Sequence, residues 1–282
     1  MRKSTFGRRL SEFLFVLAVI SVVAGYAIAH EQTLPKDVPA YMQKISVTIK
    51  AGFSEGSGVA VDRSGTTFVW TAGHVVDGLR STRKVTDPKT GTPRTIIEFA
   101  DAKIVKTLVE DGRTVGHLHL DAEVIRYSNS DHGHDLAILR VRKKGAIKTS
   151  AIFYDEEKPP KLGTQLFHVG SLLGQVGSNS MTSGIVSAHG RLIGKVIYDQ
   201  TTVTAFPGSS GGGVYLTDGR YVGMLVRGAG EGFNLIVPVR RMRTWAKRAK
   251  MEWALDPRVK MPTDDEMKKL PIEDIGADFG SK

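Results

Sequence analysis

The chain has 282 residues, of which 41% are hydrophobic and 24% charged, and it contains no cysteine. This composition is typical of a globular protein long enough for two modest hydrophobic cores or one large one. The absence of cysteine excludes a thiol nucleophile, a disulfide framework and a thiolate metal site. The formal net charge is +10, but no nucleic-acid motif accompanies it, so we expect a solvated basic surface and no nucleic-acid partner.

The first 29 residues have the pattern of a secretory signal. Basic side chains precede an uncharged run at residues 13–29, which ends in Ala27-Ile28-Ala29. A basic start, an apolar centre and a small-residue end are typical of a signal peptide, which predicts an exported protein, periplasmic or secreted. This run of seventeen uncharged residues falls just short of the roughly 20 of a bilayer span, so an uncleaved membrane anchor at residues 13–29 stays open as the alternative.

Short β-rich runs fill the middle of the chain and indicate an all-β fold. Residues 30–45 are polar with two prolines, which is typical of a linker. The β-rich runs then divide at a connector near residues 155–160 into two halves of similar strand number, residues 46–155 and 156–239. Many short strands separated by turn residues predict a sandwich or a pair of barrels.

The C-terminal part has a different character. Residues 240–255 carry Met242, Trp245, Ala249 and Trp253 at helical spacing. This pattern predicts a helix, either one that closes the second β unit through its tryptophans or a basic helix on a membrane surface. Mixed charges and prolines predict a flexible tail at residues 256–282, too short for a further domain.

Three polar residues stand at the edges of apolar or glycine-rich runs, in the order histidine, aspartate, serine. His74 follows Thr71-Ala72-Gly73, Asp135 begins Asp-Leu-Ala-Ile-Leu, and Ser210 lies in Pro-Gly-Ser-Ser-Gly-Gly. A serine hydroxyl needs a base to remove its proton, and an imidazole needs a carboxylate to fix its tautomer. These residues are therefore candidates for nucleophile (Ser210), base (His74) and orienting carboxylate (Asp135).

The glycines around Ser210 suit a tight turn that aims backbone N–H groups at one point. The N–H groups of Gly208 and Ser210 are the candidate oxyanion hole. Ser209 is the other candidate nucleophile, but the Gly-x-Ser-Gly-Gly spacing selects Ser210.

Other residues compete for these roles. Asp131 is the alternative to Asp135, which we prefer because it borders a buried run. Two His-x-His pairs raise a metal hypothesis, because alternating residues share one face of a strand. They lack an organised carboxylate partner, so we expect no metal site and no cofactor. The pairs are His117 with His119 and His132 with His134.

These segments together resemble the trypsin-like, chymotrypsin-fold serine proteases, and among them the HtrA/Deg branch. The resemblance covers roughly residues 46–245 and implies two six-stranded antiparallel β-barrels with a C-terminal helix. It implies an exported serine endopeptidase that forms an acyl-enzyme on a polypeptide substrate. The matching segments are residues 56–61, 70–76, 200–201, 207–212 and 232–239.

The chain departs from the family pattern at three positions. The usual asparagine before the serine is Ser209, the usual proline after the two glycines is Gly213, and an upstream aspartate is Thr202. Ser209 and Gly213 keep open a pseudoprotease that binds peptides without turnover, as the alternative to the endopeptidase. A non-proteolytic esterase is a third hypothesis, because it needs the same three side chains.

The resemblance also implies which residues bind substrate. The strand that pairs with an extended peptide would contain Leu225, Val226 and Arg227. The specificity pocket would lie near Val203 and the residues that follow it, and no carboxylate occurs in these stretches. A buried cation would lack its partner there, so we expect an apolar P1 residue of small to medium size. The pocket residues are Thr204, Ala205 and Phe206.

Overall fold

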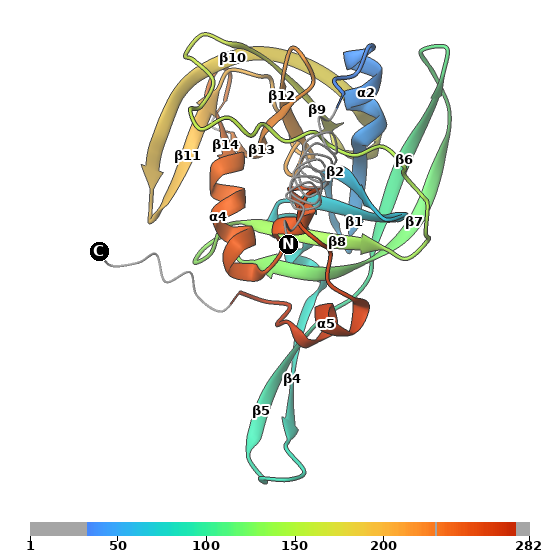
Figure 1. Cartoon of the computed structure of the whole chain (residues 1–282), viewed down its shortest axis with the longest axis vertical. Coiled ribbons are helices and arrows are strands. Elements are labelled where there is room, and N and C mark those ends of the chain that lie inside the picture. The colour runs from blue at the N-terminus through green and yellow to red at the C-terminus, as the bar shows by residue number, and fades with distance from the viewer. Residues whose placement is uncertain (1–32, 229, 275–282) are drawn as a thin grey trace, which may run out of the picture. The chain divides into compact units, whose positions relative to one another are not determined.

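The computed structural model describes residues 33–228 and 230–274. The expected signal or anchor at residues 1–29 lies outside the described residues. The described strands form two closed antiparallel barrels of six strands each and one separate two-stranded sheet (Figure 1). The prediction of an all-β fold with two six-stranded barrels is thus confirmed.

The first barrel has the strand order β1-β2-β3-β8-β7-β6, and pairing of β1 with β6 closes it. Its β-branched and aromatic side chains suit a pleated, buried surface, and Phe68 and Trp70 are fully buried. The strands are β1 (Ser46–Ala51), β2 (Ser54–Arg63), β3 (Thr66–Thr71), β6 (Ala102–Glu110), β7 (Arg113–Ser128) and β8 (Leu136–Val141).

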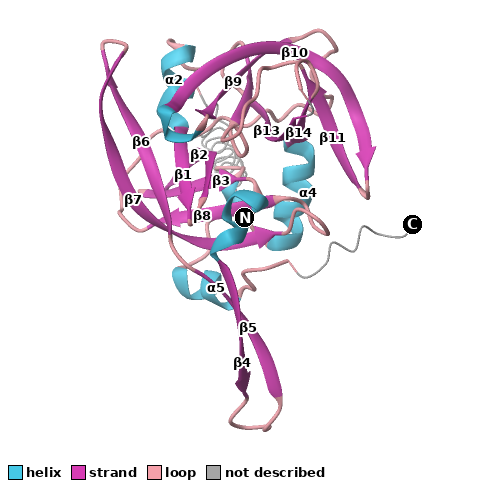
Figure 2. Cartoon of the chain, turned by 180° about the vertical axis from the view of Figure 1, so that it is seen from behind, coloured by secondary structure: helices cyan, strands magenta, loops and turns pink. Residues whose placement is uncertain are grey.

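The second barrel has the strand order β10-β11-β14-β13-β12-β9, closed by β9 against β10. The long strand β10 curves around one side of it (Figure 2). The strands are β9 (Gln165–Leu172), β10 (Gly177–Ile193), β11 (Val196–Thr201), β12 (Gly213–Leu216), β13 (Tyr221–Gly228) and β14 (Asn234–Pro238).

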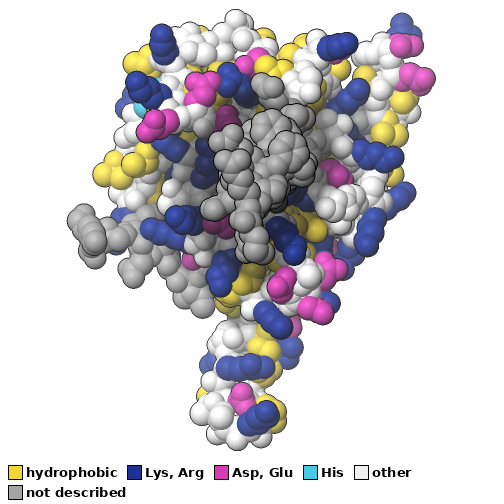
Figure 3. Space-filling model, viewed as in Figure 1, with side chains coloured by type: hydrophobic (Ala, Val, Ile, Leu, Met, Phe, Trp, Pro, Cys, Tyr) yellow, Lys and Arg dark blue, Asp and Glu magenta, His cyan; other side chains and the backbone are white. Residues whose placement is uncertain are grey.

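A hairpin of β4 (Arg80–Thr86) and β5 (Pro93–Phe99) stands apart from both barrels. It projects away from the first barrel (Figures 1 and 2), and lysine and arginine side chains lie along the visible face of this projection (Figure 3). The sequence placed a strand at residues 95–99 in the first half, but its side chains are largely exposed, so this strand pairs only within the hairpin.

Residues 38–45, expected in a linker, form the helix α2 (Val38–Ile45). Asp37 caps it, because its Oδ1 accepts a hydrogen bond from Ala40 N at 3.0 Å. Met42 and Ile45 are fully buried, so the short apolar face of this segment belongs to the core. The polar composition of residues 30–45 concealed this face.

The C-terminal helix α4 (Val239–Ala249) and the 3-10 turn η3 (Glu252–Ala254) carry the two tryptophans. Trp245 packs edge-on against Trp70, with centroids 5.7 Å apart, and Trp253 packs against Phe68 at 4.6 Å. Trp70 Nε1 also donates to Ala254 O at 3.0 Å. The tryptophans therefore dock on the first barrel rather than on the second, because their partners are on β3.

Residues 256–274, expected in a flexible tail, have ordered contacts. Thr263 and Glu266 form a capping box at the start of α5 (Asp264–Lys269). Beyond α5, Glu273 makes a parallel bridge with Tyr127 and an ion pair with Arg80 at 2.7 Å. The chain thus returns to the first barrel, while residues 275–282 of the expected tail lie outside the described residues.

Within residues 33–228 and 230–274, no helix has the length and apolar character needed to cross a membrane.

Substituting Trp253→Ala should destabilise the protein by roughly 3–5 kcal/mol, because the change opens a cavity between η3 and β3. Urea unfolding followed by fluorescence measures the change. Leu192→Ala, at a side chain that is 68% exposed, is the matched control and should alter stability by less than about 0.5 kcal/mol. Equal effects of the two changes would contradict this packing.

Candidate active site

His74 and Asp135 are in direct contact. His74 lies in the one-turn helix α3 (Gly73–Val76) that follows β3. Its Nδ1 is 3.0 Å from Asp135 Oδ1 and 3.1 Å from Oδ2, and its backbone N donates to the same Oδ1 at 3.0 Å. A Cβ on Gly73 would meet Ser128 O at 2.4 Å, so only glycine permits this close approach. With the ring proton on Nδ1, the other nitrogen, Nε2, is a proton acceptor.

Asp135 sits just before β8, in the left-handed backbone region at φ 55°. Asparagine and aspartate adopt this region more readily than other non-glycine residues. Asp135 N donates to Asn129 O at 3.2 Å, and the side chain is 1% exposed. Burial opposes ionisation, but the hydrogen bonds from His74, together with its charge and that of Arg227, outweigh it and lower the pKa of Asp135.

Asp131, the alternative carboxylate, is exposed on the loop before Asp135. Its backbone N donates to Asn129 Oδ1 at 2.7 Å. The structure thus brings Asp135, and not Asp131, to the histidine.

The loop at residues 206–212 closes on itself around Ser209. Ser209 N donates to Phe206 O at 2.9 Å, and Phe206 N donates to Ser209 Oγ at 3.1 Å. Ser209 is 1% exposed, whereas Ser210 is only partly buried. The Ser209 hydroxyl therefore stabilises the loop, and the Ser210 hydroxyl is the accessible one of the two.

This loop docks on β2 of the first barrel through Ser57. Ser57 N donates to Ser210 O at 2.7 Å, and Ser57 Oγ donates to Gly208 O at 2.7 Å. A Cβ on Gly211 would lie 2.4 Å from Thr71 Oγ1 and 3.1 Å from Ala72 N. The serine loop is therefore packed against the segment that leads into His74.

In the described part of the chain, the hydrogen bond of Ser210 Oγ runs to Val226 O at 3.5 Å, and none joins it to His74. The distance is at the long limit for such a bond. Serine–histidine contacts are often loose without substrate and tighten in the complex. Rotation about χ1 is the movement that would turn this hydroxyl from Val226.

Two backbone N–H groups of the loop, those of Gly208 and Ser210, have no acceptor among the described residues. The neighbouring groups are all bonded, since Gly211 N donates to Leu225 O at 2.8 Å and Gly212 N to Ser209 O at 3.0 Å. Gly208 has φ 92°, which a side chain would strain. The two candidate oxyanion donors are thus the two N–H groups of this loop that remain available to bind a substrate oxygen.

The residues expected to bind substrate belong to the segment at residues 204–206 and to β13. Leu225 and Val226 are buried in β13, and Leu225 N donates to Gly212 O at 2.9 Å. Arg227 is exposed, and its guanidinium donates to Ser130 O at 3.2 Å. Of the expected pocket residues, Thr204 and Phe206 are exposed and Ala205 is half-buried.

Asn234 is a residue that the sequence analysis missed. Its Nδ2 donates to Val203 O at 2.7 Å, and a Cβ on Gly228 would meet its Oδ1 at 2.5 Å. The side chain is 2% exposed and spans from the Val203 segment to the end of β13. A polar residue at the head of the apolar run Leu-Ile-Val was the signal that could have identified it.

The four other candidate histidines do not converge. His117 and His119 are exposed on β7. His132 and His134 lie in the loop before β8 rather than on a strand, and burial, with two nearby arginines, lowers the pKa of His134 to about 4. Across the described ranges, no group of three or more histidine and acidic side chains could hold a metal ion.

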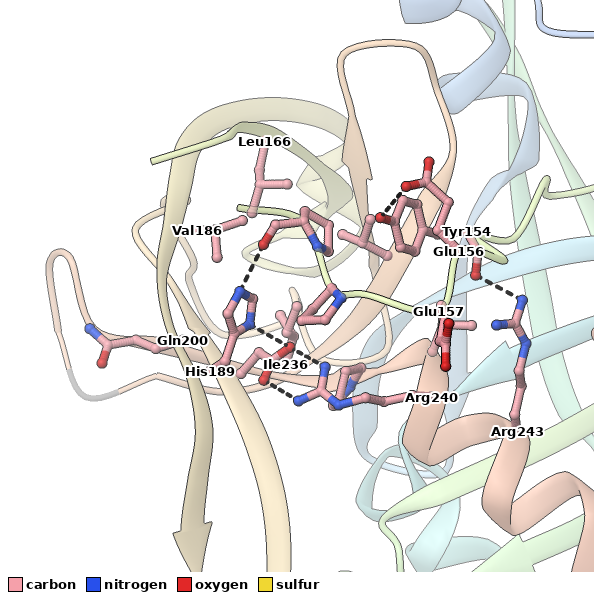
Figure 4. A pocket seen from close by; sticks show the side chains of 16 residues that line it. Tyr154, Glu156, Glu157, Leu166, Val186, His189, Gln200, Ile236, Arg240 and Arg243 are labelled. Atoms are coloured by element: carbon pink, nitrogen blue, oxygen red, sulfur yellow. Dashed lines mark hydrogen bonds and ion pairs between the residues drawn. The ribbon is translucent and has the colours of Figure 1, made fainter. Parts of the chain in front are cut away.

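A hollow in the second barrel is lined by side chains that include Leu166, Val186 and Ile236 (Figure 4), and neither His74 nor Ser210 lines it. Beside it, the Asp199 carboxylate is bonded by Arg240 at 2.5 and 2.6 Å and lies 3.0 Å from His189 Nδ1. Burial opposes ionisation of Asp199, but these partners lower its pKa. The free volume of about 40 Å³ holds no more than a few waters. We interpret this cluster as structural.

Two closed barrels joined through a serine loop define the chymotrypsin class of fold. The sequence model of one protein family, the trypsin-like peptidase domain, matches residues 56–224 of this chain. The chain therefore belongs to the trypsin-like peptidase domain family, as its sequence motifs predict.

Curated relatives come from the HtrA group. The chain is 29% identical over 178 residues to a "Serine protease Do-like HtrA" of Lactobacillus helveticus, covering 61% of this chain and 35% of that protein. It is 30% identical over 129 residues to a "Probable periplasmic serine endoprotease DegP-like" of Bartonella henselae, covering 45% and 23%. The matches thus span about a quarter to a third of these relatives' length.

Solved structures support the same fold. Deg5 has a TM-score of 0.54 at 20% identity, covering 74% of this chain and 90% of Deg5. The inactive Ser343Ala form of Rv3671c from M. tuberculosis H37Rv has a TM-score of 0.53 at 16% identity, covering 78% and 93%.

The lowered pKa of Asp135 predicts a pH-dependent stability difference between the protein and Asp135→Asn. A carboxylate with a depressed pKa contributes stability above the pKa of the unfolded chain, about 3.9, and loses it as the pH falls through the folded value. Urea unfolding from about pH 5 to about pH 2 should show the difference narrowing as the pH falls. A difference that stays constant or widens would contradict the contact with His74.

Proposed function

We propose that this protein is an exported serine endopeptidase in which Ser210 is the nucleophile, His74 the general base and Asp135 the carboxylate that orients His74. One observation carries the proposal: the histidine–carboxylate contact and the serine loop occur together. His74 Nδ1 lies 3.0 Å from Asp135 Oδ1, and the serine loop, whose Gly208 and Ser210 N–H groups have no acceptor among the described residues, is docked on β2 of the same barrel.

The reaction would proceed through an acyl-enzyme. His74 Nε2 takes the Ser210 proton as Oγ attacks the carbonyl carbon, and the imidazolium is stabilised by the buried Asp135. The N–H groups of Gly208 and Ser210 bind the oxyanion that develops. His74 then gives its proton to the leaving amine. In the second half of the reaction, His74 takes a proton from water as the water attacks the acyl carbon, and it returns that proton to Ser210 Oγ as the acyl group leaves.

The substrate would be an extended polypeptide. Leu225, Val226 and Arg227 would pair with its backbone, as an added strand does with a sheet. Thr204, Ala205 and Phe206 would border the P1 side chain, and the buried Asn234 would limit the depth of the pocket. A short pocket without a carboxylate favours a small or medium apolar P1 residue.

Two observations support export: the basic and apolar pattern of residues 1–29, and the similarity to two probable periplasmic endoproteases. The same segment, if not cleaved, would anchor the protease domain to a membrane.

A fluorophosphonate probe should add once to the protein and not to Ser210→Ala, as measured by intact mass. The reason is that only an activated serine attacks this probe. Ser81→Ala, an exposed serine on β4, is the matched control and should react as the unchanged protein does. A folded sample that takes no adduct would favour the peptide-binding pseudoprotease.

Cleavage of a peptide library should occur mainly after small or medium apolar residues. Mass spectrometry of the products gives the P1 distribution, and Ser210→Ala supplies the background. Dominant cleavage after arginine or lysine would disprove the proposed pocket. Hydrolysis of esters with no peptide cleavage would favour the esterase.

A further inference from the structure

The Pro207 carbonyl, next to the candidate oxyanion hole, is held by a turn of the second barrel. Leu173 N donates to Pro207 O at 2.7 Å. No peptide bond in the described chain is cis, so the C=O and N–H of the Pro207–Gly208 peptide point in opposite directions. Holding the carbonyl toward Leu173 therefore directs the Gly208 N–H away from the turn, where an oxyanion could reach it.

The turn that holds Pro207 has a costly backbone conformation. Leu173 has φ 62°, in the left-handed region that side chains other than those of Asn, Asp and His rarely adopt. Its side chain is 63% exposed, so little packing compensates for this conformation. A second contact must therefore keep the turn in place.

Glu55 of β2 supplies that contact. Its Oε2 accepts a hydrogen bond from Gln175 N at 2.8 Å, within the 3-10 turn η2 (Gly174–Val176) that follows Leu173. A Cβ on Gly174 would lie 2.1 Å from the same oxygen, so the carboxylate sits directly on the turn. Lys50 pairs with the other carboxylate oxygen at 3.1 Å. The hydrogen bond from Gln175, aided by Lys50, lowers the pKa of Glu55 despite an opposing effect of burial.

We propose that Glu55 is a positioning residue for the nucleophile loop. It fixes the turn at residues 173–176, which in turn fixes the Pro207–Gly208 peptide and so the direction of the Gly208 N–H. The role of this N–H as an oxyanion donor rests on the proposed function, whereas the coupling of Glu55 to the loop does not.

The Gly208 residue is thus held on both of its peptides. Ser57 Oγ donates a hydrogen bond to the carbonyl of Gly208 at 2.7 Å, and Leu173 N donates to the carbonyl of Pro207, the residue before Gly208. Strand β2 supports both contacts, the first directly through Ser57 and the second through Glu55, which bonds the turn that contains Leu173. Loss of Glu55 would loosen the second contact and leave the first.

Amide hydrogen exchange of Leu173 and Gln175 tests the coupling without any need for catalysis. In Glu55→Ala both amides should exchange about tenfold faster or more, because the charged acceptor that holds the turn is lost. Glu55→Gln, which keeps an oxygen acceptor, should restore part of the protection and serves if the alanine variant does not fold. Glu110→Ala, an exposed glutamate at the end of β6, is the matched control and should change neither amide. The proposal would be overturned if Glu55→Ala made the Gln175 amide exchange faster but left the exchange rate of the Leu173 amide unchanged.

Kinetics tests the consequence for the site. In Glu55→Ala, kcat should fall by about 10- to 100-fold with KM nearly unchanged, less than the roughly 10²- to 10³-fold cost of deleting an oxyanion donor. The affinity for a peptide boronic acid, which places an oxygen in the hole, should fall in parallel, with partial recovery in Glu55→Gln. Unchanged kcat and boronate affinity would overturn the positioning role. If the unchanged protein hydrolyses nothing, the proposed function fails, while the exchange result still decides the coupling.

Discussion

The contact between the Ser57 backbone and the Ser210 carbonyl joins the two halves of the site. Ser57 N and Oγ bond the carbonyls of Ser210 and Gly208, both at 2.7 Å, and Thr71 Oγ1 donates to Ser57 O at 2.8 Å. The first barrel, which carries His74, thereby sets the position of a loop that belongs to the second. The position of Ser210 relative to His74 depends on this docking.

Backbone conformations that are costly alone recur around this contact. Asp135 and Leu173 are both in the left-handed region, at φ 55° and φ 62°. Each is retained by a specific hydrogen bond: His74 and Asn129 hold Asp135, and Pro207 holds Leu173. Such strain persists only where surrounding contacts determine the conformation. The site is thus held by many modest interactions between segments, and the exposed carboxylate of Glu55 can influence it.

The sequence predicted what local patterns encode. Short β-rich runs and turn residues indicated a sandwich or a pair of barrels, and the family resemblance selected the barrels. The edge of the Asp-Leu-Ala-Ile-Leu run distinguished Asp135 from Asp131. Contacts between distant segments left no such pattern. Glu55 and Gln175 are 120 residues apart in the sequence, and the residues around a glutamate in a strand do not indicate which distant group it will bind. The buried face of α2 and the docked residues 271–274 were missed because these short polar segments are ordered by tertiary contacts with the first barrel, and their local sequence does not encode those contacts.

The proposed mechanism requires that Ser210 forms a covalent acyl intermediate. Mixing the protein with an activated ester of a small apolar amino acid, quenching with acid and mapping the modified peptide tests this directly. We expect one acyl group per chain, on Ser210, and its loss when a longer incubation before the quench allows water to hydrolyse it. An acyl group on another residue, or none in a folded sample, would contradict it.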